Sequence, residues 1–191
     1  MKIKILKVRR QTFSCEFFIS SLFKMTFSHL ILTVGIPGSG KTTWVRNFKR
    51  THGGMVFLSS DEIRDEFGEY DYDEQTVGKR SPLVHEEIRR LIKEKMNTPP
   101  PTGSMGWEFV VDATNTEESE WKKFKEMGFT LMSAHVFECD VEEAKRRNKT
   151  RKQKVPEYVI DDKFRELEEN RSHLPLYFHY INVHPQDEKL L

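Results

Sequence analysis

The sequence predicts an α/β fold in which a parallel β-sheet lies between two layers of helices. Two observations support this prediction. Short runs of almost continuously apolar residues alternate along the chain with longer segments whose apolar residues recur at helical spacing, as in parallel sheets covered on both faces. In addition, the first apolar run, residues 29–34, leads directly into a glycine-rich loop followed by a helical pattern, which is the context of a phosphate-binding loop.

The composition is that of a single globular domain. The chain has 191 residues, of which 37% are hydrophobic and 32% charged. Its formal net charge of +1 gives no general attraction to polyanions, so any such binding must come from local patches. Cys15 and Cys139 provide neither a disulfide framework nor metal-ligand spacing, which favours a reducing compartment. No apolar run approaches the roughly 20 residues of a membrane span, so we expect no membrane partner and a cytoplasmic location.

Residues 1–24 form an N-terminal extension whose role the sequence leaves open. Their basic start and apolar middle partly resemble a secretory signal, but the apolar stretch is short, contains Glu16 and precedes no small-residue cleavage site. The extension is alternatively a disordered or non-native addition, with Met25 as the true start. We therefore assign the single predicted domain to residues 25–191.

The first half of this domain is predicted to contain two strands and two helices. The strand over 29–34 precedes a helix over 41–50, which the glycines of 52–54 terminate. Residues 55–58 (MVFL) form a second short strand. Another helix begins near Asp61 and leads into an acidic, tyrosine-containing stretch.

The second half is predicted to continue the alternation with three more strands. Apolar residues at helical spacing from Pro82 onward predict a helix, and the proline- and glycine-rich stretch after it predicts a loop. In chain order we expect a helix over 82–97, a loop over 98–106, a strand over 107–112, a helix ending near Gly128, a strand over 130–138, helices over 141–150 and 156–170, and a strand over 177–183.

The glycine-rich loop, GIPGSGKT, matches the pattern G-x-x-x-x-G-K-S/T in full. Its glycines let backbone amides approach an anion, and the positive end of the following helix adds to the attraction. Lys41 is expected to reach the β- and γ-phosphates, and the Thr42 hydroxyl to ligate Mg²⁺. ATPases, GTPases and kinases share this loop. The expected nucleotide-binding residues of the loop are Gly35, Pro37, Gly38, Ser39, Gly40, Lys41, Thr42 and Thr43.

A carboxylate and an arginine follow the second predicted strand. Asp61 lies just past the strand end, where ligands bind in open α/β sheets, so it is a candidate general base for an attacking hydroxyl. Arg64 lies three residues further on the same helical face and is a candidate phosphate ligand. The structural alternative is helix capping, because Ser59 and Glu62 have capping-box spacing and acidic residues suit a first helical turn.

The end of the next predicted strand carries Asp112. A carboxylate at this position suits Mg²⁺ or its water shell in a P-loop enzyme, although Asp112 alternatively orients Arg64. An acid that ends an apolar strand is a poor structural choice, which favours a functional role. For Thr114 and Asn115 the structural interpretation is favoured, as residues that form the turn and cap the next helix.

Residues 145–154 (KRRNKTRKQK) contain seven lysines or arginines. Arginines of such a segment are able to close on a transferring phosphate or to attract a polyanion. The simpler alternative is a solvated charge run at the end of a helix. The acidic stretch over 61–74 argues against a large nucleic-acid surface nearby.

With these motifs in view, residues 29–170 resemble the kinase domain of phage-type polynucleotide 5′-hydroxyl kinases, within the wider group of P-loop kinases. Four blocks carry the resemblance in order. The D-x-T-N strand end and the R-N-x-x-R segment followed by V-P are its most selective parts. The blocks read ILTVGIPGSGKTTW, SSDEIR, VVDATNTEESEWKKF and FECDVEEAKRRNKTRKQKVPEYVIDDKF.

The resemblance implies a P-loop NTPase sandwich with strand order 2-3-1-4-5 and an arginine-rich lid. It implies ATP and Mg²⁺ as cofactors, the 5′-hydroxyl end of DNA or RNA as partner, and a repair role, in host cytoplasm for a phage protein. Asp61 would be the general base, and Arg64 would contact the phosphate near the acceptor. Asp112 would support the metal and the acceptor, and Arg147 and Arg151 would bind the donor phosphates. Lys41, Asp61, Arg64 and Arg151 are thus the expected catalytic residues.

Two features depart from the family pattern. Ser59 and Ser60 stand where asparagine and arginine are common, which weakens any inherited contact there, and the 98–106 loop has no recognised counterpart. The chain is too short to include a separate phosphatase domain beside the kinase domain, so no 3′-phosphatase activity is expected. Two alternatives remain: a kinase for a small hydroxyl metabolite, and a nucleotide-binding regulator without acceptor chemistry. The sequence does not distinguish DNA from RNA, nor does it specify the oligomeric state.

Overall fold

The computed structural model describes residues 27–67, 74–151 and 153–186, with only the backbone for residues 74–81. The expectations for residues 1–24 and for Met25 lie outside these ranges. The described chain contains five strands, β1 Phe27–Val34, β2 Val56–Ser59, β3 Gly106–Asp112, β4 Leu131–Phe137 and β5 Tyr180–His184. Its helices are α2 Lys41–Thr51, α3 Ser60–Glu66, α4 Glu74–Met96, α5 Glu118–Lys125, α6 Val141–Asn148, α7 Glu157–Asn170, the 3₁₀ turn η1 Arg171–His173 and α8 Leu174–Tyr177.

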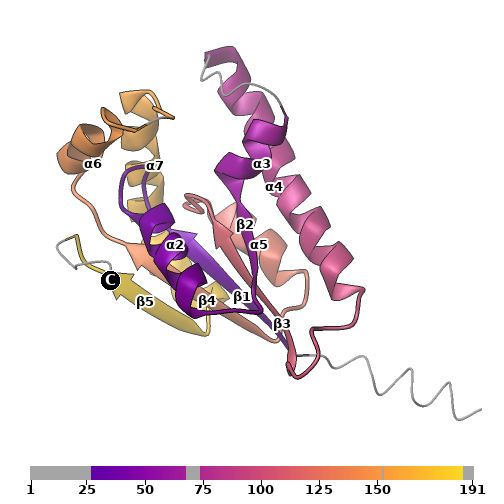
Figure 1. Ribbon diagram of the computed structural model, residues 1–191. Coiled ribbons are helices and arrows are strands. Elements are labelled where there is room, and N and C mark those ends of the chain that lie inside the picture. The colour runs from indigo at the N-terminus through magenta and orange to yellow at the C-terminus, as the bar shows by residue number, and fades with distance from the viewer. Residues whose placement is uncertain (1–26, 68–73, 152, 187–191) are drawn as a thin grey trace, which may run out of the picture.

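The five strands form one parallel sheet in the order β2-β3-β1-β4-β5, as the resemblance implies (Figure 1). The central strand β1 pairs with β3, with Leu30 opposite Phe109, and with β4 on its other side. This order brings the carboxyl ends of β1, β2 and β3 to one edge of the sheet. The loops that carry the glycine-rich motif, Asp61 and Asp112 therefore meet there.

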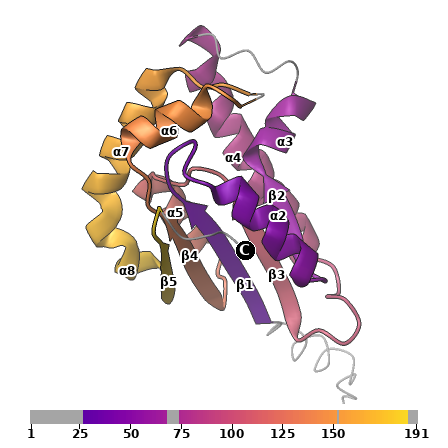
Figure 2. The same ribbon diagram turned by 60° about the vertical axis from the view of Figure 1, so that its left-hand side comes forward.

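Helices cover both faces of the sheet (Figures 1 and 2). Strand β1 supplies side chains to both layers. Leu30 and Leu32 pack into the main core with residues of α4, α5 and α7. Ile31, between them, points to the opposite face, where it packs with Val45 of α2. Because β1 is buried on both faces, its sequence is a continuous apolar run, which made it easy to predict.

The largest differences from the sequence-based expectation are at the starts of α4 and β5. Helix α4 begins at Glu74, eight residues before the expected start at Pro82. A proline removes one backbone hydrogen bond and crowds the preceding turn, but it does not prevent helix on either side, so Pro82 lies within α4. Strand β5 begins at Tyr180 rather than at residue 177, because residues 171–177 form η1 and α8 instead.

Among the described residues, no helix is both long and apolar enough to cross a bilayer. Helix α4 has 23 residues, but charged residues recur along its length. The described residues also contain no cluster of three or more His, Cys, Asp or Glu side chains suited to a metal ion.

Candidate active site

A cavity of about 770 Å³ opens at the carboxyl edge of the sheet. Its walls come from the glycine-rich loop, α2, the ends of β2 and β3, α3, α4 and the segment after α6. All of the predicted site residues line this cavity except Gly35 and Ser39, which belong to the glycine-rich loop but do not line the cavity. The predicted residues that line it are Pro37, Gly38, Gly40, Lys41, Thr42, Thr43, Asp61, Arg64, Asp112, Arg147 and Arg151.

The glycine-rich loop is tightly packed on its outer side by α6. Gly38 has a φ of +89°, and a Cβ atom at this position would lie 2.7 Å from the backbone oxygen of Ala144 in α6. Glycine is therefore required here for both backbone conformation and space. At the base of the loop, the amide of Gly35 donates to the carbonyl of Thr114, at 2.9 Å, which joins the loop to the end of β3.

The Lys41 ammonium is buried within the loop. Its Nζ donates to the carbonyl of Ile36 at 2.7 Å and to the Ser39 hydroxyl at 3.3 Å. Burial lowers the pKa of Lys41 to about 8, although the carboxylates of Asp112 and Asp61 oppose the shift. A buried, partly compensated cation of this kind binds a phosphate group strongly, because the phosphate replaces the hydration that burial removed.

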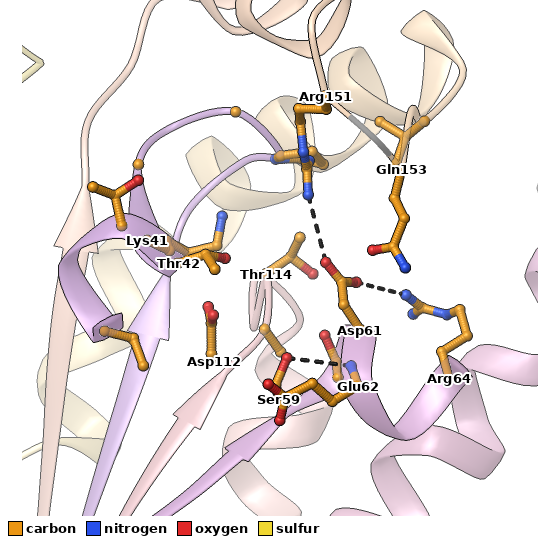
Figure 3. A pocket seen from close by; sticks show the side chains of 18 of the residues that line it. Lys41, Thr42, Ser59, Asp61, Glu62, Arg64, Asp112, Thr114, Arg151 and Gln153 are labelled. Atoms are coloured by element: carbon orange, nitrogen blue, oxygen red, sulfur yellow. Dashed lines mark hydrogen bonds and ion pairs between the residues drawn. The ribbon is translucent and has the colours of Figure 1, made fainter. Parts of the chain in front are cut away.

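Asp112 and Thr42 face each other across the floor of the cavity (Figure 3). Burial raises the pKa of the Asp112 carboxyl, while Lys41 and a hydrogen bond from the Thr42 hydroxyl lower it in part. Of the two roles expected for Asp112, this arrangement favours the one beside Thr42, because the ion pair of Arg64 is with Asp61. A carboxylate and a hydroxyl side by side suit Mg²⁺, which takes few protein ligands and completes its shell with phosphate oxygens and water.

Asp61 lies between two arginines that come from different parts of the chain (Figure 3). Its Oδ1 accepts from Arg64 Nη1 at 2.9 Å, and its Oδ2 lies 3.5 Å from Arg151 Nη2. The capping alternative holds for its neighbour, because the Ser59 hydroxyl accepts from the Glu62 amide at 3.4 Å. The Ser59 contact confirms capping at this turn, and Asp61 lines the cavity, where its expected role as general base stays a prediction.

The segment after α6 reaches across the cavity to α3. Besides the contact of Arg151 with Asp61, the Gln153 amide donates to both carboxylate oxygens of Asp65, at 2.8 and 3.0 Å. Asn148 holds the segment through its side chain. Its side-chain amide donates to the Val155 carbonyl at 2.7 Å, and its Oδ1 accepts from the backbone amide of Val155 at 3.1 Å. A single buried side chain thus joins the two ends of the segment.

Most of the basic segment has a structural role, as its simpler interpretation suggests. Lys145 pairs with Asp161 at 2.8 Å, and Arg146 pairs with Glu143 at 2.6 Å, both outside the cavity. Arg147 lines the cavity and reaches the Gly38 carbonyl at 3.4 Å while Glu143 holds its Nε. Among the described members of the segment, only Arg147 and Arg151 are cations that line the cavity.

The turn after β3 follows the structural interpretation in part, because Asn115 forms the turn, but the N-cap of α5 is Glu117, so neither Thr114 nor Asn115 caps that helix. Asn115 adopts a left-handed conformation, with φ of +46°. Its side-chain amide donates to the backbone carbonyl of Thr33 at 2.8 Å, and its backbone carbonyl accepts from the Trp121 indole at 2.7 Å. Asn115 therefore links β1, the turn and α5, which fixes the position of Asp112 three residues earlier.

Sequence reasoning missed four residues near the predicted site. His85 and Lys163 line the cavity on its α4 and α7 sides, and Asn148 and Gln153 position the segment that carries Arg151. Each has a partner outside its own helical turn, from 7 residues away for Asn148 to 88 residues away for Gln153. Their only local signal is a polar side chain within a helical or basic pattern, which is common on protein surfaces.

Comparison with known proteins places these features in a family. A family model described as an AAA domain (AAA_33) matches residues 30–173. A chain of the solved Pnkp1/Rnl/Hen1 RNA repair complex matches with 25% identity and a TM-score of 0.56, over 77% of this chain and 46% of that chain. A gluconokinase from Sinorhizobium meliloti 1021 matches with 14% identity and a TM-score of 0.55, over 86% and 85% of the two chains. The present chain thus spans less than half of the RNA-repair chain that it matches, and its likeness to the gluconokinase is one of fold.

Proposed function

The chain belongs to this AAA domain family (AAA_33), whose model covers most of its length, and on that premise we propose that it transfers the γ-phosphate of ATP to the 5′-hydroxyl of a polynucleotide. The coarser part of this proposal, a P-loop kinase-like fold with a nucleotide site, follows from the family and the sheet order. The identity of the acceptor is the more specific part of the proposal, and the site geometry and one similar solved structure support it.

The observation that carries the proposal is the position of Asp61. Its carboxylate lies in the same cavity as the glycine-rich loop and is held by Arg64 and Arg151 from opposite sides. A nucleotide regulator needs no carboxylate beside its γ-phosphate position, whereas a hydroxyl acceptor needs a group that takes its proton. The polynucleotide acceptor is supported by the 25% identical chain of an RNA repair complex.

In the proposed reaction the acceptor hydroxyl lies against Asp61 and loses its proton to the carboxylate. The hydroxyl oxygen forms a bond to the γ-phosphorus as the bond to the bridging oxygen of ADP breaks. Lys41, Arg147 and Arg151 compensate the charge on the phosphate oxygens, and most of the rate enhancement comes from such positioning and charge compensation. Thr42 and Asp112 would hold Mg²⁺, which supplies further neutralisation of the phosphates when bound.

The first test is transfer of labelled γ-phosphate from ATP to 5′-hydroxyl DNA and RNA oligonucleotides. We expect Asp61→Asn to lower transfer by about 10²- to 10⁴-fold while ATP still binds, because the variant keeps shape but does not accept a proton. Asp162→Asn is the matched control, since Asp162 is an exposed carboxylate of α7 that pairs with Arg165 and does not line the cavity. Near-full activity of Asp61→Asn would show that Asp61 is not the base.

A kinase of a small hydroxyl compound is the second candidate. The acidic residues Glu62 and Asp65 line the cavity, and they would repel the phosphates of a nucleic acid. Competition between an oligonucleotide and a panel of sugars and nucleosides distinguishes the two candidates. Label on a small compound, with none on any oligonucleotide, would replace the polynucleotide proposal by this one.

A further inference from the structure

The wall of the cavity formed by α4 contains one side chain without an assigned role, His85. Its side chain is 12% exposed, and the exposed part lies in the cavity. Nδ1 of the ring lies 3.2 Å from Oε2 of Glu120 on the neighbouring helix α5. The two atoms are at ion-pair distance but lack hydrogen-bond geometry, so Nδ1 is a buried nitrogen without a hydrogen-bond partner among the described residues.

Glu120 does not need His85 to compensate its charge. Arg89 contacts Oε2 of Glu120, and Lys123 lies 2.6 Å from Oε1. Although burial opposes ionisation of Glu120, these contacts and the contact with His85 lower its pKa to about 2. Arg89 and Lys123 would still pair with Glu120 if His85 were replaced, so the ion-pair network between α4 and α5 does not depend on His85 alone.

The second ring nitrogen of His85 remains accessible from the cavity. Nε2 has no hydrogen-bond partner among the residues that the structure describes, and it is not among their buried unpaired atoms. The negative charge of Glu120 near Nδ1 favours the tautomer that carries its proton on that nitrogen. In the neutral ring, Nε2 then presents a lone pair to whatever occupies the cavity.

We propose that His85 contacts the acceptor, by accepting a hydrogen bond at Nε2 from a donor group of the nucleotide that carries the 5′-hydroxyl. This inference rests on the proposed function. His85 shares the cavity with Asp61 and Arg64 on α3, which packs against α4. The matching donor chemistry is an O–H or N–H group, supplied either by a ribose 2′-hydroxyl or by a base.

The experiment compares acceptor and ATP kinetics of the unmodified chain, His85→Phe and His85→Gln. His85→Phe keeps a ring of similar size without the nitrogens, whereas a Gln side-chain oxygen is able to accept a hydrogen bond. We expect His85→Phe to raise the KM for the oligonucleotide about tenfold, the effect of losing one buried hydrogen bond, and to change the KM for ATP by less than about twofold. His85→Gln should restore part of the loss.

The matched control is His173→Phe. The Nδ1 atom of His173 lies 2.8 Å from Oε2 of Glu118, so it forms a similar histidine–glutamate pair, but it does not line the cavity. We expect this variant to leave both KM values unchanged. Parallel assays on DNA and RNA oligonucleotides identify the donor: a loss confined to RNA assigns the 2′-hydroxyl, and an equal loss on both assigns a base.

An unchanged oligonucleotide KM in His85→Phe, or an equal rise in the KM for ATP, would overturn the assignment of His85. Failure of the proposed function has a different signature, because the unmodified chain would then label no oligonucleotide. In that case the same variants are assayed with whichever small hydroxyl compound is labelled. An unchanged KM for that compound would overturn contact of His85 with any acceptor.

Discussion

The Lys41 ammonium is a buried cation whose charge depends on pH in the range where enzymes are assayed. Burial lowers its pKa to about 8, so the free protein loses this charge as the pH rises through that value. The neutral amine attracts a triphosphate less strongly. Nucleotide binding, unlike the chemistry after it, should therefore weaken in mildly alkaline solution.

We expect the KM for ATP to rise as the pH increases from 7 to 9, with a smaller change in kcat, because bound phosphates hold the proton on Lys41. The measurement is initial-rate kinetics across this range with saturating acceptor. Lys41→Arg is the control, since a guanidinium stays charged throughout and should remove the pH dependence even where it lowers activity. A KM that is flat across the range in the unmodified chain would contradict a lowered pKa.

At the scale of single elements, the segment between α6 and α7 depends on Asn148, which is 5% exposed. Its amide and carbonyl both pair with the backbone of Val155. Asn148→Ala would leave the buried N–H and C=O groups of Val155 without partners. We expect the free energy of unfolding to fall by about 1–3 kcal/mol, measured by urea denaturation.

Asn182→Ala, at an exposed position of β5, is the control and should change the free energy of unfolding by less than about 0.5 kcal/mol. In Asn148→Ala, kcat should also fall, because Arg151 lies only three residues further along the segment. Equal stability of the two variants would show that the Asn148 contacts contribute nothing.

Helix α2 packs on the sheet through an aromatic cluster that contains histidine. The Trp44 ring lies 4.3 Å from that of His135 on β4, and His135 stacks in turn on His184 of β5 at 5.1 Å. Burial, with help from the charge of His184, lowers the pKa of His135 to about 4. An unfolded histidine titrates near 6.5, so the unfolded chain binds more protons between these two values.

The free energy of unfolding should therefore fall as the pH decreases from about 6.5 to 4, by up to about 1.4 kcal/mol per pH unit from this group. His135→Phe removes the titrating group and keeps an aromatic ring for Trp44, so the fall should be shallower. Denaturation curves at several pH values in this window test the difference. Parallel pH profiles of the two proteins would contradict the lowered pKa.

For the whole molecule, the formal net charge of +1 provides no field that attracts a nucleic acid, so salt effects must come from particular side chains. Arg46 and Lys49 are exposed on α2 and line the cavity beyond Thr42. If the acceptor is a polynucleotide, its phosphates are expected to run past them. Each phosphate contact adds about 0.7 to the slope of log affinity against log salt for a single strand.

Arg46→Ala should reduce the salt slope of the oligonucleotide KM by about 0.7, whereas the KM for a mononucleoside acceptor should keep its salt dependence. Arg50→Ala is the matched control, because Arg50 lies on the same helix but does not line the cavity. Equal slopes for both variants would mean that the acceptor leaves the cavity by another route.

The sheet and the phosphate loop could be predicted from the sequence because their signals are local. A strand buried on both faces is a continuous apolar run, and the loop has a fixed spacing that begins where β1 ends. The predicted start of α4 was wrong because a proline in the sequence suggests a helix boundary, whereas the folded helix continues on both sides of Pro82. His85 and Asn148 were missed because their partners, 35 and 7 residues away, become neighbours only after folding.

The double ion pair of Asp61 also has a consequence for how two substrates share the cavity. Arg151 forms an ion pair with the Asp61 carboxylate. A triphosphate that draws Arg151 toward itself frees one oxygen of Asp61 for an incoming hydroxyl. Thermodynamic linkage is reciprocal. An acceptor bound at Asp61 would therefore strengthen nucleotide binding, through Arg151, by the same coupling free energy. Each substrate would thereby promote binding of the other, and neither alone would fully assemble the site.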